Sequence, residues 1–94
     1  MEIAYHDGAH GEGAILTFDG TVVEFFAPGK AGSVARMHVR MLWFKVDGPN
    51  RKGYYEIDFS TSPRGLGGVT IYVPIDAWPA VDQLLQAVSA ATAG

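Results

Sequence analysis

The chain has 94 residues, of which 48% are apolar and 18% charged, and its formal net charge is −3. This composition predicts one folded domain over residues 1–94 and excludes an intrinsically disordered chain. The acidic charge balance argues against general nucleic-acid binding. The absence of cysteine excludes a disulfide scaffold, a cysteine-ligated zinc site and a thiol nucleophile.

Neither a signal peptide nor a membrane span is visible in the sequence. The first residues lack the basic region and the apolar region that a secretory signal requires. The apolar runs are far shorter than the roughly 20 residues that cross a bilayer as a helix. We therefore expect a cytoplasmic protein with no transmembrane segment.

The distribution of glycine and proline organises the chain. Residues 1–12 are expected to form a polar N-terminal segment. Residues 13–73 are expected to form antiparallel strands, because clusters of glycine and proline separate short runs rich in β-branched and aromatic side chains. These runs cover residues 14–18, 21–26, 34–46, 54–60 and 69–73.

The pair Asp19-Gly20 lies between two of these runs and predicts a β-hairpin. A type I′ turn needs a positive φ at both central residues, and an Asp-Gly pair meets that need better than most pairs. The two runs that flank it should therefore be adjacent antiparallel strands.

The run 34–46 changes the parity of its apolar residues. Basic residues alternate with apolar ones up to Arg40, whereas Leu42, Phe44 and Val46 are apolar at even positions. A continuous strand cannot exchange its buried face without a bulge or a bend. We expect a break near residues 40–42 that either divides two strands or bends one sharply.

The last segment changes its apolar period from two to between three and four. This spacing predicts an amphipathic helix over residues 76–91. Asp76 is the expected N-cap, and Pro79 then lies in the first turn, where its missing N–H removes no intrahelical hydrogen bond. The apolar positions that carry the period are Trp78, Val81, Leu84, Leu85, Val88 and Ala91.

Strands followed by one helix indicate the α+β class, mostly β. Over residues 13–91 the order of elements resembles the small bacterial pleckstrin-homology-like (PH-like) domains. The features that carry this resemblance are the hairpin at Asp19-Gly20, the hairpin around residues 48–53 and the closing helix with Trp78. The resemblance implies a strongly bent antiparallel sheet, or partly open barrel, of six or seven strands capped by one C-terminal helix.

One departure limits what the resemblance implies about function. Lipid-binding members of the family carry basic residues in and beside the first hairpin loop, whereas here that loop is Asp19-Gly20. The resemblance therefore implies the fold more than phosphoinositide binding, because a fold alone does not define a function. A flat antiparallel sheet with the helix across one face is the competing architecture, and the parity change near Met41 favours the bent sheet.

Four residues near the N-terminus have side chains of the kinds that serve as metal ligands in proteins, imidazole and carboxylate: His6, Asp7, His10 and Glu12. On an extended strand the two histidines would lie about 13 Å apart, from a rise of about 3.3 Å per residue, so only a turn at Gly8 could bring them together. We favour a polar segment without a metal or other cofactor.

Arg36, His38 and Arg40 alternate along one predicted strand and are candidate binding residues. Three basic side chains on one face could hold a phosphate, a carboxylate or a lipid headgroup. Lys45, Arg51 and Lys52 would extend the patch if the next hairpin packed alongside. The opposing interpretation is a solvated face neutralised across the sheet by Glu56 and Asp58.

Alternation also predicts outward aromatic side chains. Tyr54 points outward if Tyr55 points inward, Tyr72 lies opposite Ile71 and Val73, and either Phe25 or Phe26 must face solvent. Outward aromatic residues on a sheet suggest a partner surface, so Tyr54 and Tyr72 are candidate binding residues.

No catalytic motif accompanies these features. The glycine-rich stretch 65–68 lacks the Lys-Ser/Thr pair that engages phosphates. We expect a non-enzymatic module that binds a protein partner or itself, as a homodimer, through a sheet face or edge. The alternatives are an anionic-ligand or membrane-surface module that uses the basic strand face, and a small enzyme.

Overall fold

The computed structural model describes residues 1–8, 11–27, 33–61 and 68–93. Seven strands, a single 3₁₀ turn and one α-helix lie in this part of the chain. In order they are β1 (Glu2–Asp7), β2 (Gly11–Phe18), β3 (Val22–Ala27), β4 (Ser33–His38), η1 (Val39–Met41), β5 (Trp43–Asp47), β6 (Tyr54–Ser60), β7 (Val69–Pro74) and α1 (Trp78–Ala93).

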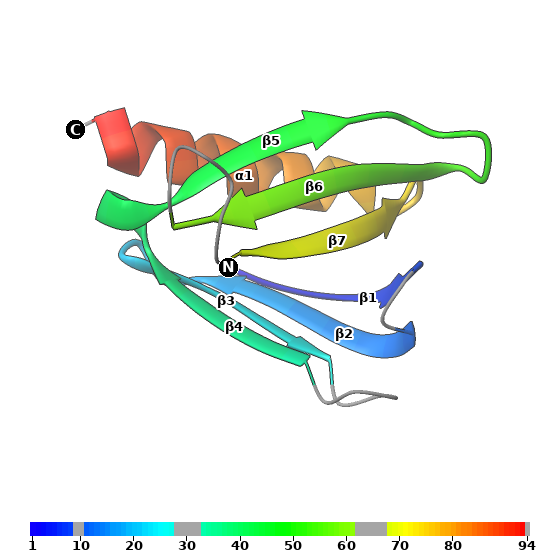
Figure 1. Cartoon of the computed structure of the whole chain (residues 1–94), viewed down its shortest axis with the longest axis horizontal. Coiled ribbons are helices and arrows are strands. Elements are labelled where there is room, and N and C mark those ends of the chain that lie inside the picture. Colours follow the sequence, from blue (N-terminus) through cyan, green and yellow to red (C-terminus); the bar gives the residue numbers. More distant parts are fainter. Residues whose placement is uncertain (9–10, 28–32, 62–67, 94) are drawn as a thin grey trace.

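The strands form two antiparallel sheets, and the helix packs against the second one (Figure 1). The first sheet has the order β1-β2-β3-β4 and the second the order β5-β6-β7. The predicted class, mostly β with one C-terminal helix, is confirmed. Neither sheet is closed, and the described strands divide between two sheets rather than following one continuous bend.

The break predicted near residues 40–42 is confirmed, and it separates the two sheets. β4 ends at His38, and the chain makes the 3₁₀ turn η1 before β5 begins at Trp43. The Nδ1 atom of His38 accepts a hydrogen bond from the backbone N–H of Arg40 at 3.1 Å, which caps this turn. Val39 and Leu42 are both buried, so the turn inserts apolar side chains into the core while the strand direction changes.

The predicted hairpin between β2 and β3 is also confirmed, with Phe18 opposite Val23. Its turn differs from the expected one, because only Gly20 has a positive φ, of 102°. Gly20 occupies the first central position, where a type II′ turn places glycine. The Asp19 carboxylate accepts hydrogen bonds from the backbone N–H groups of Thr21 and Val22, both at 2.8 Å, and holds the turn.

The prediction of a polar segment over residues 1–12 is wrong for residues 2–7 and for residues 11–12, where β2 begins. Residues 2–7 form β1, which pairs with β2 along its length. Tyr5 and Asp7 point into the protein and are 7% and 1% exposed, respectively. The apolar alternation of Ile3 and Tyr5 ends on a carboxylate, and a strand that buries Asp7 does not show the usual apolar pattern.

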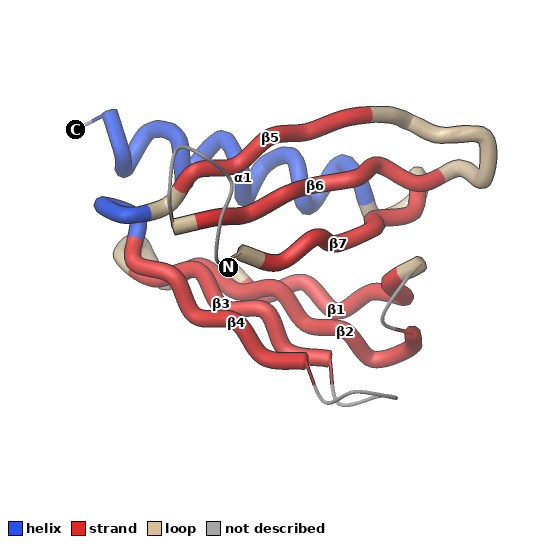
Figure 2. Tube along the Cα trace, viewed as in Figure 1, coloured by secondary structure: helices blue, strands red, loops and turns tan. Residues whose placement is uncertain are grey.

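The two sheets meet where β1 lies beside β7 (Figure 2). The backbone N–H of Gly8 donates to the carbonyl of Tyr72 at 3.0 Å. The backbone N–H of Tyr72 in turn donates to Oδ2 of Asp7 at 2.9 Å, and the Tyr5 hydroxyl donates to the same oxygen at 2.8 Å. The Asp7 carboxylate therefore links β1 to β7 and replaces a backbone acceptor at this junction.

The helix α1 closes the core next to η1 and β7. It begins at Trp78, two residues later than predicted, so Asp76 lies in the preceding turn and not at the N-cap. The Trp78 ring stacks on Tyr55 at a centroid distance of 4.1 Å and an interplanar angle of 11°. The buried helix residues are those that carry the apolar period, namely Val81, Leu84, Leu85 and Val88. Burying four such side chains contributes several kcal/mol, at about 1.5–3 kcal/mol each.

Candidate functional site

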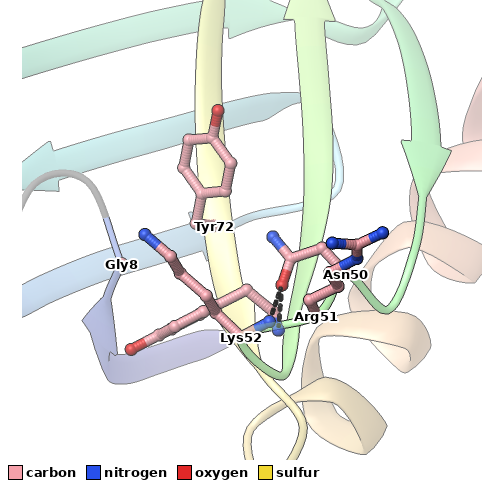
Figure 3. A pocket seen from close by; sticks show the side chains of 6 residues that line it. Gly8, Asn50, Arg51, Lys52 and Tyr72 are labelled. Atoms are coloured by element: carbon pink, nitrogen blue, oxygen red, sulfur yellow. Dashed lines mark hydrogen bonds between the residues drawn. The ribbon is translucent and has the colours of Figure 1, made fainter.

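A cavity of about 480 Å³ lies beside the loop between β5 and β6 (Figure 3). Its lining brings together the end of β1, the β5–β6 loop and the outer face of the second sheet. The lining residues are Gly8, Asn50, Arg51, Lys52, Tyr54 and Tyr72. Two of the five residues predicted as a binding site, Tyr54 and Tyr72, are therefore placed in one cavity.

Asn50 organises the loop. Its side-chain Oδ1 accepts hydrogen bonds from the backbone N–H groups of Lys52 at 2.9 Å and Tyr54 at 3.1 Å. Its backbone N–H donates to the Tyr54 carbonyl at 2.8 Å, and its carbonyl accepts from the Gly53 N–H at 3.1 Å. Because Oδ1 is held by two donors, the orientation of the side-chain amide is set, and its nitrogen points away from the loop backbone (Figure 3).

Gly8 lets the rings of the second sheet approach the end of β1. A Cβ atom at this position would lie 3.0 Å from Cε1 of Tyr54 and 3.1 Å from Cβ of Tyr72. Contacts this short are tighter than ordinary van der Waals packing, so a larger side chain at this position would require the neighbouring tyrosines to shift. The cavity therefore has a floor in which the half-buried Tyr54 ring lies against the Gly8 backbone.

The sheet face beyond the cavity is acidic. The Tyr72 hydroxyl donates to Oε1 of Glu56 at 3.1 Å, and this hydrogen bond, together with the Glu56 charge, raises the pKa of Tyr72. The Thr70 hydroxyl donates to Oδ1 of Asp58 at 2.6 Å on the same face. In Figure 3 the Tyr72 hydroxyl points away from the loop. The site thus has a cationic end at Arg51 and Lys52 and a carboxylate beyond Tyr72.

Arg36, His38 and Arg40 do not form the predicted basic strand face. Arg36 and His38 lie exposed on β4, but Arg40 lies in η1, where the strand has ended. Arg36 is opposite Glu24 on β3, so the cross-strand neighbour of this cation is a carboxylate of its own sheet. Glu56 is on β6, and so is not the partner of these residues, because β4 and β6 belong to different sheets.

The three additional basic residues that could have extended this patch lie in the second sheet and its loop. Lys45 is opposite Asp58 on β6 and forms an ion pair with Asp47 at 3.8 Å. Arg51 and Lys52 line the cavity described above. The condition for extending the patch, a hairpin packed alongside β4, is not met, because β4 and the hairpin of β5 and β6 belong to different sheets.

An apolar row crosses the outer face of the first sheet. Phe26 is the outward member of its pair, 44% exposed, whereas Phe25 is buried. The strand register places Ala4, Ile15, Phe26 and Val34 opposite one another in turn. The prediction that either Phe25 or Phe26 faces solvent is therefore confirmed, and Phe26 lies within this apolar row.

A groove of about 370 Å³ separates β5 from α1. β5 is at the edge of the second sheet and, among the described strands, pairs only with β6. The groove is lined by apolar side chains of both elements and by three polar residues of the helix. The lining residues are Phe44, Val46, Trp78, Leu85, Asp82, Gln86 and Ser89. The sequence analysis did not predict this groove. Two patterns could have indicated it, namely the apolar residues Phe44 and Val46 at even positions of β5 and the position of Trp78 on the helix.

Of the four candidate metal ligands in the N-terminal segment, the structure describes the side chains of His6 and Asp7, which lie on opposite faces of β1. His6 is exposed and Asp7 is buried. His10 and the side chain of Glu12 lie outside the described residues, as does most of the glycine-rich stretch 65–68. Within the described part of the chain, no group of three or more metal-binding side chains is placed to hold an ion.

No protein-family description, no curated protein and no solved structure matches this chain. None of the helices in the described part of the chain has the length and apolar character to cross a membrane.

Proposed function

We propose that the protein is an interaction domain that binds an extended segment of a partner protein along β5, in the groove beside α1. The observation that carries this proposal is the combination of an edge strand with an apolar groove at its side. An extended peptide can add a strand to such an edge through its backbone while alternate side chains fill the groove. We also propose that the fold is PH-like, since a four-stranded sheet, a three-stranded sheet and a closing helix follow one another in that order.

The lining of the groove defines the chemistry of the partner. Phe44, Val46 and Leu85 favour apolar side chains at alternate positions of the segment. Asp82 is half-buried at the groove and its carboxylate accepts a hydrogen bond from Gln86 at 3.0 Å. Among the described residues that line the groove Asp82 is the one charged side chain, so a basic residue of the segment is favoured next to it.

The experiment starts from a displayed library of random peptides selected on the immobilised protein. The expected products are peptides with alternating apolar residues and one basic residue. A tryptophan at Ser89 would fill the groove, whereas one at the neighbouring, exposed Ala90 would not. Ser89→Trp should weaken binding of the selected peptides at least about tenfold, which corresponds to 1.4 kcal/mol, and Ala90→Trp should leave it unchanged.

Charge provides a second matched pair. Asp82→Asn should weaken the binding of peptides that carry a basic residue. Asp76→Asn removes the same charge outside the groove and should leave this binding unchanged. Sedimentation of the protein alone tests whether a second copy of the chain occupies the groove. If the chain forms a dimer that Ser89→Trp dissociates, the groove binds a second copy and the partner proposal is wrong. If both tryptophan variants bind the selected peptides equally, the groove is not the site.

A further inference from the structure

The cavity at Gly8 and the β5–β6 loop shares no residue with the groove and has a different chemistry. Arg51 and Lys52 are both exposed on its rim, and the lining residues that the structure describes include no acidic side chain. Among the described residues neither of these two cations takes part in an ion pair. A protein with a net charge of −3 thus presents two uncompensated positive charges at one cavity.

We propose that this cavity binds an aromatic carboxylate, with the anionic group at Arg51 and Lys52 and the flat body against Tyr54 and Tyr72. The Arg51 guanidinium can donate two parallel hydrogen bonds to a carboxylate. The side-chain nitrogen of Asn50 is a third donor, and its direction is already set by the two backbone groups that hold Oδ1. In Figure 3 this nitrogen and the Lys52 ammonium lie on the Tyr72 side of the loop.

The size of the cavity and its two tyrosine side chains favour a small organic molecule over an inorganic ion. Its volume of about 480 Å³ is in the range of sites for small organic molecules, roughly 300–1,000 Å³. Tyr54 and Tyr72 are both half-buried, and the Tyr72 hydroxyl is engaged by Glu56. The ring of Tyr72 is therefore available for stacking, while its polar group is directed elsewhere.

The neighbouring acid favours a singly charged ligand. Glu56 lies on the same sheet face as Tyr72, and its charge repels a doubly charged anion about twice as strongly as a singly charged one at the same distance. A run of phosphates, as in a nucleic acid, would also pass Asp58 on this face. A single carboxylate can be held at this cationic end of the cavity without that repulsion.

An aromatic carboxylate has two possible sources, a free aromatic acid and the C-terminus of a peptide that ends in an aromatic residue. The probes are benzoate for the first source and N-acetylphenylalanine for the second, followed by ¹H–¹⁵N chemical-shift changes. The amides of Arg51 and Lys52 and the side-chain amide of Asn50 should shift with one or both probes. N-acetylphenylalanine amide, which lacks the carboxylate, and inorganic phosphate, which lacks the flat body, should each bind at least about tenfold more weakly.

The variants assign the effect to the cavity. The double variant Arg51→Gln/Lys52→Gln should lower the affinity for whichever of the two carboxylate probes binds more tightly by at least about tenfold. Arg36→Gln combined with Lys45→Gln removes the same charge elsewhere and should change the affinity less than about threefold. Asn50→Asp keeps the oxygen that holds the loop but replaces the donor nitrogen by an acceptor, and should abolish binding.

Three outcomes would overturn the proposal. The first is that neither probe shifts the three loop residues. The second is that phosphate binds as tightly as both carboxylates, which would assign a bare-anion site. The third is that the two double variants weaken binding equally, which would show attraction by overall charge only.

Discussion

Asp7 provides the sharpest test of how the two sheets are held together. Its carboxylate is 1% exposed and accepts hydrogen bonds from the Tyr5 hydroxyl and from the backbone N–H of Tyr72. Asp7→Ala leaves both donors without this acceptor in a region that excludes water. An unsatisfied buried donor costs about 1–3 kcal/mol, so the loss of the acceptor for two donors should lower the free energy of unfolding by about 2–6 kcal/mol.

Urea denaturation measures this loss. With an m value of about 1.5 kcal/mol/M for a small domain, a loss of 3 kcal/mol moves the midpoint down by about 2 M. Asp7→Asn keeps one acceptor oxygen and should lose about 1 kcal/mol, less than the alanine variant. Tyr5→Phe should lose about 1 kcal/mol, and its effect should not add fully to that of Asp7→Ala, because both changes remove the same hydrogen bond.

An Asp7→Ala variant would contradict this role if its unfolding free energy lay within about 0.5 kcal/mol of that of the parent protein, which is about a third of a molar in urea midpoint. That result would mean that the Asp7 carboxylate does not join β1 to β7. Full additivity of Tyr5→Phe and Asp7→Ala would contradict the direct contact between the two side chains.

Three further predictions concern pH and packing. Burial, the charge of Asp7 and the hydrogen bond to it raise the pKa of Tyr5, so the folded protein keeps this proton after the unfolded chain loses it near pH 10. Stability should therefore be complete below pH 10 and fall above it, and Tyr5→Phe should make this decline shallower by about 1.4 kcal/mol per pH unit in urea titrations. Backbone N–H groups of the hairpin turn lower the pKa of Asp19 more than Arg36 does, so ¹³C titration should find it low in both the parent protein and Arg36→Gln. A Cβ at Gly68 would overlap the carbonyl of Phe59, so Gly68→Ala should lower the thermal midpoint and cost about 2 kcal/mol or more.

Local patterns in the sequence predict most of the strands and the helix. The alternation along β6 and the Asp19-Gly20 pair both report interactions between near neighbours, which a sequence displays directly. The parity change before Leu42 predicts the break at η1 for the same reason. β1 was missed because Asp7 interrupts the apolar alternation, and its burial depends on the Tyr72 backbone, 65 residues away.

The candidate site was predictable only in part. Alternation placed Tyr54 and Tyr72 on an outer face, and the structure adds that Gly8 lies against both. That contact arises from the meeting of two sheets, which no local pattern reports. The error on Arg40 has a related cause, because counting alternate residues assumes a strand that continues, and here the strand ends at His38.

In the proposed complex an extended segment of the partner adds to β5 and fills the groove at α1. Intermolecular nuclear Overhauser effects in a complex with a selected peptide report this placement residue by residue. We expect contacts from the peptide backbone to Lys45 and Val46 and from its apolar side chains to Trp78 and Leu85. Contacts with Phe26 and Val34 on the first sheet, and none with β5, would contradict it.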